Sequence, residues 1–162
     1  MDLFKPSKNR FYDLCIFLLL YTLWDVLISY FYYSFLQGFK LTYTPVEITR
    51  VELFENIIFA PIWEEFVYRW APITFVLTFF IRGRGPSISN KSLWPVIIIS
   101  SYIFGWGHEG NGIENLLLQG VGGIFMSILY IRTNNIKYSI LFHMIWNTFC
   151  LLYWDQLSFV PS

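Results

Sequence analysis

Long apolar runs, separated by short polar connections, dominate the pattern of this chain. Five such stretches stand out, at about residues 14–36, 54–81, 93–106, 116–131 and 138–153. None alternates apolar and polar residues in the manner of a half-buried strand, so each is predicted to be a helix. The first two are long enough for a bilayer crossing of about 20 residues, and the last three are expected to extend into their polar flanks. The short connections favour antiparallel neighbours.

The composition indicates a membrane protein. Of the 162 residues, 56% are hydrophobic and 14% are charged, whereas soluble domains usually carry about 25% charged residues. Lipid cannot satisfy backbone polar groups, so helices are the spanning structure expected here. The predicted fold is therefore all-α, a polytopic membrane helical bundle of about five transmembrane helices. The formal net charge is zero, which gives no basic surface for nucleic acid.

Lysine and arginine residues are distributed unevenly between the two sets of connections. On the side that includes the N-terminus they are Lys5, Lys8, Arg10, Arg82, Arg84, Lys91, Arg132 and Lys137. The opposite side has only Lys40 and Arg50. The positive-inside rule therefore predicts a multi-pass protein of the cell membrane with a cytoplasmic N-terminus. We divide the chain into an N-terminal helix with its connector, residues 1–54, and a core of residues 55–155.

The most unusual feature is a group of charges inside the second apolar stretch. Residues 64–69 read Glu-Glu-Phe-Val-Tyr-Arg, with apolar residues on both sides. A charge near the centre of a spanning helix costs about 2.5–3.5 kcal/mol, so an intramembrane cluster indicates a functional site. On a helix Glu65 and Arg69 are four residues apart and can pair. Glu64 lies about 100° further round the axis, where a less compensated carboxylate has a raised pKa and can act as a base.

The two histidines of the chain lie in two further motifs. His108 closes the sequence Phe104-Gly-Trp-Gly-His at the end of the third stretch. His143 and Asn147 are four residues apart in the fifth stretch, so they share one helical face and offer neutral donors to a developing oxyanion. Each motif alone also has a structural interpretation, as an ion pair, an interface histidine or hydrogen bonds between helices. Their conjunction favours a catalytic site.

Three motifs in the order EExxxR, FxxxH and HxxxN on successive spans resemble those of the CPBP family. This is the CAAX protease and bacteriocin-processing family, also called ABI, and it includes the type II CAAX prenyl endopeptidases. The similarity covers about residues 55–154. It implies an intramembrane glutamate protease in which Glu64 is the general base and His108 helps it to activate water.

The same resemblance implies roles for the remaining motif residues. His143 and Asn147 would form the oxyanion hole, and Glu65 and Arg69 would hold the helix and adjust the electrostatics of the site. No metal or other cofactor is needed for this mechanism. The implied partners are the lipid bilayer and a peptide substrate, which is a hydrophobic leader, a small bacteriocin or pheromone precursor, or a lipidated C-terminus.

Two features depart from the expected pattern. Glu109 follows His108 directly, which places a third acidic group near the predicted site. The motifs also begin at different depths in the membrane. We therefore expect the second span to begin near Phe54 and the third to continue past His108, so that the four predicted catalytic residues converge.

Other functions remain open at this stage. A zinc protease would use His108, His143 and a glutamate as ligands with one open position, although no HExxH motif is present. A non-catalytic immunity or binding protein would carry the same motifs without cleavage. A proton-coupled carrier would use buried carboxylates such as Asp25, which could instead be satisfied by Tyr21 or Ser29.

Overall fold

Helices make up nearly all of the described chain. The computed structural model describes residue 6 and residues 8–36, 39–43, 47–80, 93–108, 112–154 and 157–161. Within these residues, five continuous helical stretches occur at the five predicted places. Several contain π-helical turns, labelled η, which wind more widely than an α-helix. The prediction of an all-α bundle is confirmed.

The bounds of the five stretches agree with the prediction to within a few residues. The first comprises α1 (Arg10–Tyr30) and η1 (Phe31–Leu36), and the third is α5 (Leu93–Trp106). The second runs unbroken through α2 (Arg50–Phe54), η2 (Glu55–Phe59), α3 (Ala60–Glu65), η3 (Phe66–Trp70) and α4 (Ala71–Phe80). The fourth comprises α6 (Ile113–Asn115), η4 (Leu116–Gly120) and α7 (Val121–Thr133), and the fifth α8 (Ile136–Phe149) and η5 (Cys150–Trp154).

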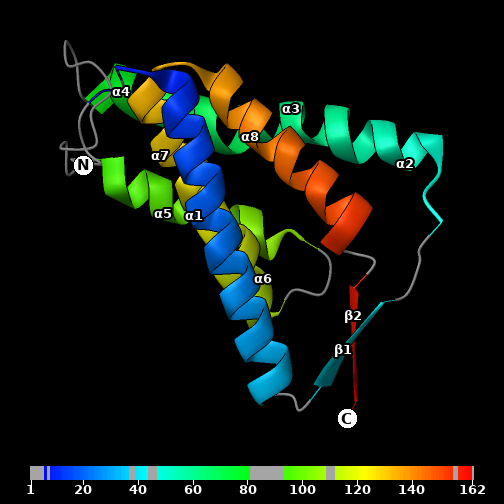
Figure 1. The fold of residues 1–162 in the computed structure, drawn as a ribbon. Helices are drawn as coiled ribbons and strands as arrows, with labels where there is room; N and C mark the ends of the chain where they lie inside the picture. The colour runs from blue at the N-terminus through cyan, green and yellow to red at the C-terminus, as the bar shows by residue number, and fades with distance from the viewer. Residues whose placement is uncertain are drawn as a thin grey trace.

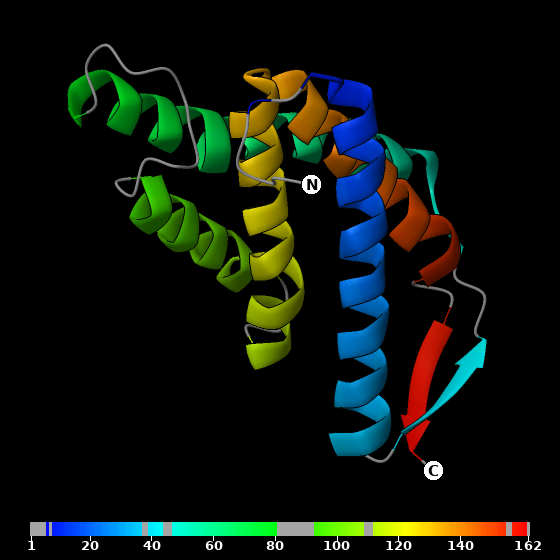
Figure 2. The same cartoon turned by 60° about the vertical axis from the view of Figure 1, so that its left-hand side comes forward.

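Helix α7 is central to the bundle, because it contacts α1, α5 and α8. Figure 1 shows the whole arrangement, and Figure 2 shows α1 and α7 side by side with opposite directions. In both views the long stretch from α2 to α4 runs across these two helices. Because the stretches cross one another, residues that are distant in the sequence can meet at one place in the bundle.

Apolar side chains fill two clusters in the interior. The larger one joins α1, α5, α7 and α8 and consists of Leu14, Phe17, Tyr21, Phe104, Met126, Leu129 and Phe142. The second joins α4, α5 and α7 and consists of Ile73, Leu93, Ile97 and Ile131. The first helical stretch is therefore packed into the same core as the helices that carry the three motifs.

Apolar side chains also cover much of the outer surface. Leu27 on α1, Phe80 on α4 and Ile99 on α5 are each more than half exposed. Contiguous exposed patches of this kind are rare on soluble monomers, whereas in a bilayer they face lipid. Two helical stretches, Arg10–Ser34 and Ile113–Thr133, are long and apolar enough to cross a membrane, and the shorter Leu93–Trp106 is also apolar.

Small residues allow a close helix contact at α7. A Cβ atom added at Gly123 would lie 2.7 Å from Nη2 of Arg69 and 2.9 Å from Cβ of Ser101. On the facing helix, a Cβ atom at Gly105 would lie 2.6 Å from the backbone nitrogen of Gly120. Real Cβ atoms do not approach so closely, so α5 and the α6–η4–α7 stretch can pack at this distance only with glycine here.

A buried ion pair joins the first turn of α1 to the last turn of α7. The guanidinium of Arg132 donates to both carboxylate oxygens of Asp13, over 2.8 Å from Nε and 3.1 Å from Nη2. The side chains are only 6% and 5% exposed. Such two-pronged contacts are among the strongest pairs that a carboxylate forms, so this pair fastens α1 to the bundle at one end.

A small antiparallel sheet of β1 (Phe39–Tyr43) and β2 (Leu157–Pro161) was not predicted. The register pairs Phe39 with Pro161 and Tyr43 with Leu157. Residues 39–43 lie outside the five long apolar stretches, and they do alternate apolar and polar side chains. Each strand has five residues, too few to be stable without the other.

Candidate active site

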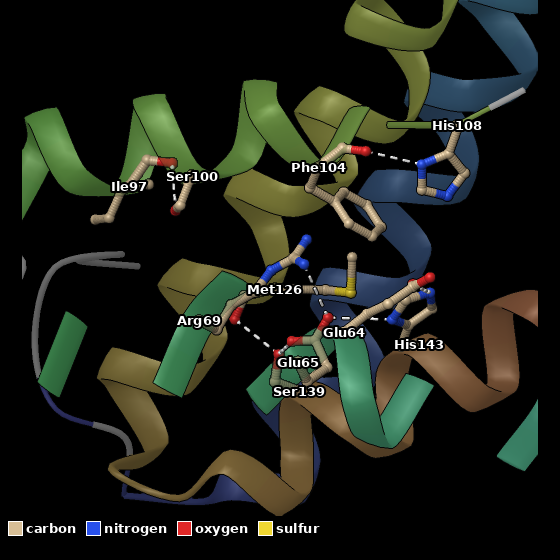
Figure 3. Close-up of polar contacts among 10 residues, drawn as sticks. All are labelled: Glu64, Glu65, Arg69, Ile97, Ser100, Phe104, His108, Met126, Ser139 and His143. Atoms are coloured by element: carbon tan, nitrogen blue, oxygen red, sulfur yellow. Dashed lines mark hydrogen bonds and ion pairs between the residues drawn. The ribbon is translucent and has the colours of Figure 1, made fainter. Parts of the chain in front are cut away.

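Glu65 lies in a buried polar cluster between the second and fifth helical stretches. Its carboxylate is 3.2 Å from Nη1 of Arg69, which confirms the predicted pair, and 3.1 Å from Nδ1 of His143. The hydroxyl of Ser139 on α8 donates to the other carboxylate oxygen. Figure 3 shows Glu65 among these three partners. Both Glu65 and Arg69 are 0% exposed, so this carboxylate is shielded from any ligand by its own partners.

The charge of Arg69 is compensated in two ways. Its ion pair with Glu65 is the first, and the second is the ring of Phe104, whose centroid lies 4.0 Å from Cζ of the guanidinium. An aromatic face attracts a cation at this distance. No guanidinium nitrogen makes a hydrogen bond with a described residue. Arg69 therefore balances charge within the cluster and connects the EExxxR motif to the FxxxH motif.

Glu64 is placed differently, although it is the adjacent residue. Its side chain is 27% exposed, and one carboxylate oxygen lies 3.6 Å from Nε2 of His143. His143 thus lies between the two glutamates, with Nδ1 toward Glu65 and Nε2 toward Glu64. Because a carboxylate can only accept, Nδ1 of His143 is the donor to Glu65. The Nε2 atom then carries a proton only when the imidazole is a cation.

His108 lies just beyond the end of α5. The prediction that this helix continues past His108 is wrong: α5 ends at Trp106, and the backbone N–H of His108 donates to the carbonyl of Gly105 over 3.3 Å. Nδ1 of His108 is 2.8 Å from the Phe104 carbonyl, and since a carbonyl only accepts, Nδ1 is the donor. The ring therefore caps the helix end, and Nε2 of the neutral ring remains an acceptor.

Asn147 is held by the second helical stretch. Its side-chain N–H donates to the backbone carbonyl of Asn56 over 2.7 Å, and Asn56 lies in the π-helical turn η2. A side-chain amide has two N–H groups, so this contact orients Asn147 and leaves the second N–H for a ligand.

A cavity of about 570 Å³ brings the predicted catalytic residues together. Its lining includes Glu64, His108, His143 and Asn147, whereas Glu65 and Arg69 lie behind it. The four residues come from α3, the end of α5 and α8. This volume is in the usual range for ligand sites, about 300–1,000 Å³. Glu109 lies outside the described residues.

Several lining residues were not identified from the sequence. They are Tyr21, Asn56, Ala60, Tyr68, Phe104, Gly107, Leu118, Gln119, Met126, Trp146, Cys150 and Leu151, and Asp25 was noted only as a relay candidate. Tyr68 lies four residues after Glu64, a spacing that would have placed it on the same helical face. The same spacing relates Ala60 to Glu64 and Leu151 to Asn147, whereas the lining residues of α1, η4 and α7 have no motif residue on their own helix to indicate the face.

The suggested partners of Asp25 prove to be occupied or directed elsewhere. The Tyr21 hydroxyl donates to the carbonyl of Leu118 over 3.3 Å, and the Ser29 hydroxyl makes no hydrogen bond with a described residue. The interpretation that Tyr21 or Ser29 satisfies this carboxylate is therefore wrong. Asp25 is 5% exposed and lines the cavity.

Four of the π-helical turns contribute residues to the cavity. Asn56 comes from η2, Tyr68 from η3, Gln119 from η4 and Leu151 from η5. A π-helical turn shifts the register of a helix and re-aims its side chains, and such turns are frequent at functional sites. The backbone irregularities of this bundle are therefore concentrated around the same cavity as the three motifs.

Among the described residues, no group of three or more histidine, cysteine, aspartate or glutamate side chains is arranged to hold a metal ion. His143 is already engaged by Glu65, and Nδ1 of His108 by a carbonyl. The four predicted catalytic residues offer a carboxylate, two imidazoles and an amide donor around one cavity.

These features define a class: an all-α membrane protein with a carboxylate–imidazole site inside its helical bundle. The family model of the type II CAAX prenyl endopeptidase Rce1-like proteins matches residues 47–149, so the chain belongs to this family. This is a family of membrane proteases, and the resemblance drawn from the three motifs is confirmed. No curated protein and no solved structure matches the chain.

Proposed function

We propose that this protein is a multi-pass intramembrane endopeptidase that hydrolyses a peptide bond with water activated by Glu64. The observation that carries the proposal is the cavity in which Glu64, His108, His143 and Asn147 meet. The apolar outer surface supports a position in the bilayer, and the charge bias supports a cytoplasmic N-terminus. The substrate is a leader peptide, a small precursor peptide or a lipidated C-terminus.

The two nitrogens of His143 face two different carboxylates. Nδ1 donates to Glu65, and Nε2 lies toward Glu64 and the cavity. For His143 to donate to a ligand in the cavity as well, its ring must carry a proton on both nitrogens. The mechanism therefore uses the imidazolium form, which presents Nε2–H toward the cavity.

The reaction then follows from the positions of the acceptors and donors. Glu64 takes a proton from water, and the water oxygen attacks the peptide carbonyl carbon. His108 orients this water by accepting its second O–H at Nε2. The carbonyl oxygen becomes an oxyanion and is stabilised by N–H groups of Asn147 and His143. Glu64 then gives its proton to the leaving amine nitrogen as the C–N bond breaks.

This mechanism requires no metal ion, and it separates the roles of the two glutamates. Glu64 carries out proton transfer because it lines the cavity, and Glu65 holds His143 in place because it is buried with Arg69 and Ser139. A zinc mechanism would instead need His108, His143 and a glutamate to converge on one ion.

Cleavage of candidate peptides by purified protein in liposomes tests the proposal. A hydrophobic leader peptide and a prenylated C-terminal peptide would be compared with wild type, Glu64→Gln, His108→Ala and Asn147→Ala. Loss of a general base typically costs about 10²–10⁴-fold in rate, so we expect Glu64→Gln to lose nearly all activity. Glu55→Gln is the matched control, because Glu55 is exposed on the same helical stretch and does not line the cavity.

The outcomes separate the candidate functions. Activity that is insensitive to a chelator and lost in Glu64→Gln supports the proposal. Equal cleavage by wild type and Glu64→Gln contradicts the role of Glu64. Loss of activity with a chelator, restored by zinc, would establish a metalloprotease instead.

A further inference from the structure

We propose that Asp25 determines substrate specificity by binding a cationic group of the peptide, an ammonium or a guanidinium, close to the bond that is cleaved. This inference rests on the proposed endopeptidase function and names the class of substrate for it. Asp25 lies on α1, outside the residues 47–149 that the family model matches. The three motifs therefore assign no role to it.

The position of Asp25 is the first observation. Its side chain is 5% exposed and lines the same cavity as Glu64, His108 and Asn147. A carboxylate inside a spanning helix characteristically faces a cavity or an ion pathway. A peptide that enters the cavity to reach Glu64 therefore shares it with the carboxylate of Asp25.

The charge of the lining is the second observation. Among the described residues that line the cavity there are two carboxylates, Asp25 and Glu64, and no lysine or arginine, so the cationic form of His143 balances only one of the two negative charges. The nearby cation Arg69 is fully buried against Glu65 and does not belong to the lining. A cavity of this composition attracts a cation and repels an anion, and the low dielectric of the bilayer strengthens both effects.

Helix α1 is held at a defined position beside η4. The indole N–H of Trp24 donates to the carbonyl of Leu117 over 2.8 Å, and the hydroxyl of Tyr21 donates to the carbonyl of Leu118 over 3.3 Å. Both contacts lie within about one helical turn before Asp25 and hold this part of α1 against η4. Gln119 is the next residue of η4 and also lines the cavity.

Gln119 supplies a second acceptor in the same part of the cavity. Its side-chain oxygen is buried and makes no hydrogen bond with a described residue. An ammonium group has three donors and a guanidinium five, so either can bind a carboxylate and an amide oxygen together. The rings of Tyr21 and Trp146, whose centroids are 4.6 Å apart, line the cavity and add aromatic surface for a cation.

The predicted preference follows from these groups. A peptide with lysine or arginine near the cleaved bond is accepted, and one with glutamate there is rejected. For the same reason, a peptide whose own C-terminal carboxylate must enter this part of the cavity is a poor substrate.

Kinetics with matched peptides test the proposal. A leader-type peptide that wild type cleaves would be made with Lys, Gln or Glu at each of the three positions on either side of the cleaved bond. We expect kcat/KM of wild type to favour Lys over Glu at least ten-fold at one position. In Asp25→Asn the Lys peptide becomes slower, the Glu peptide becomes faster, and their ratio approaches one.

Two further variants control the experiment. Asp25→Glu retains the carboxylate and should keep the preference for Lys, which also guards against an asparagine variant that fails to fold. Glu55→Gln removes an exposed carboxylate outside the cavity and should keep the wild-type ratio. A Lys-to-Glu ratio in Asp25→Asn equal to that of wild type overturns the role of Asp25, as does an equal loss on all three peptides with a shifted pH profile.

The failure of this inference can be distinguished from failure of the proposed function. Cleavage by wild type without regard to peptide charge contradicts the role of Asp25 and leaves the endopeptidase intact. If wild type cleaves no peptide, binding of the labelled Lys and Glu peptides to wild type and Asp25→Asn decides the matter. Tighter binding of the Lys peptide that disappears in Asp25→Asn supports the cation site, and equal binding overturns it.

Discussion

Glu64 and Glu65 are adjacent and chemically identical, yet they lie in two different regions of the molecule. Glu65 belongs to a dry region in which Arg69, Ser139 and His143 occupy its oxygens. Glu64 belongs to the cavity region, where it is accessible and lies 3.6 Å from one imidazole nitrogen. The comparison shows that helical rotation of about 100° per residue is enough to separate a structural carboxylate from a reactive one.

The largest effect on stability is expected for Glu65→Gln, in contrast to Glu64→Gln. Glu65→Gln leaves the guanidinium of Arg69 buried without its counter-charge, and breaking a buried pair in this way costs about 3–5 kcal/mol. We expect its thermal unfolding in detergent to occur at a markedly lower temperature. Glu64→Gln, which leaves the buried cluster intact, should unfold close to wild type. Equal losses of stability would show that the two regions are not distinct.

The ion pair of Asp13 and Arg132 gives a second test, at a site away from the cavity. Asp13→Asn removes one partner of a nearly buried pair, so we expect a loss at the lower end of the same range, about 3 kcal/mol. Neither residue lines the cavity, so cleavage per folded molecule should stay near wild type. Unfolding curves and active-fraction measurements on the same sample check both statements. A lower cleavage rate per folded molecule in Asp13→Asn would contradict this and would show that the ion pair influences the catalytic site.

Gly123 should show a smaller effect, caused by crowding in the dry region. Its substitution by alanine places a methyl group 2.7 Å from Arg69 and 2.9 Å from Ser101, and overpacking of this kind costs about 1–3 kcal/mol. Gly107→Ala is the matched control, because the nearest atom to its added Cβ is 3.5 Å away. Thermal unfolding of both variants is the measurement. Equal stability of the two variants would contradict the close contact of α5 and α7.

The smallest effect should arise at Glu52, in the first turn of α2. The backbone N–H and the hydroxyl of Thr49 donate to its carboxylate, both over 2.8 Å, and lower its pKa below the ordinary value of 4.5. Because the pKa is depressed in the folded state, the cap contributes its full stabilisation at pH values above the ordinary pKa of 4.5. The contribution is lost as the pH falls through the lower, folded pKa. Glu52→Gln should abolish this step in unfolding measurements below about pH 4.5, and an unchanged acid profile would argue against the cap.

Contacts within one helix could be predicted from the sequence. The pair of Glu65 and Arg69 and the shared face of His143 and Asn147 follow from helical spacing alone. The positions of the five helical stretches follow from the apolar pattern. These features depend on residues close in the chain, so no knowledge of the tertiary structure is needed to derive them.

Contacts between helices could not be predicted in the same way. Ser139 reaches Glu65 from a position 74 residues away, and Asn147 reaches a carbonyl 91 residues away. The acceptor at Asn56 lies in a π-helical turn, for which the sequence carries no clear signal. Helix α5 ends before His108, and the imidazole ring of His108 caps the end of this helix. Each of these features depends on how helices cross or where their backbones are irregular.

The pair of Asp13 and Arg132 also has a consequence for biosynthesis. Its partners are 119 residues apart, and a ribosome adds about 5–20 residues per second, so roughly 6–24 s pass between their syntheses. During this interval α1 has neither its ionic fastening nor the carbonyls of η4 that later accept Tyr21 and Trp24. The earliest helix of the bundle is therefore fixed only late in synthesis. A nascent chain halted before residue 117 should keep α1 free to exchange with the insertion machinery.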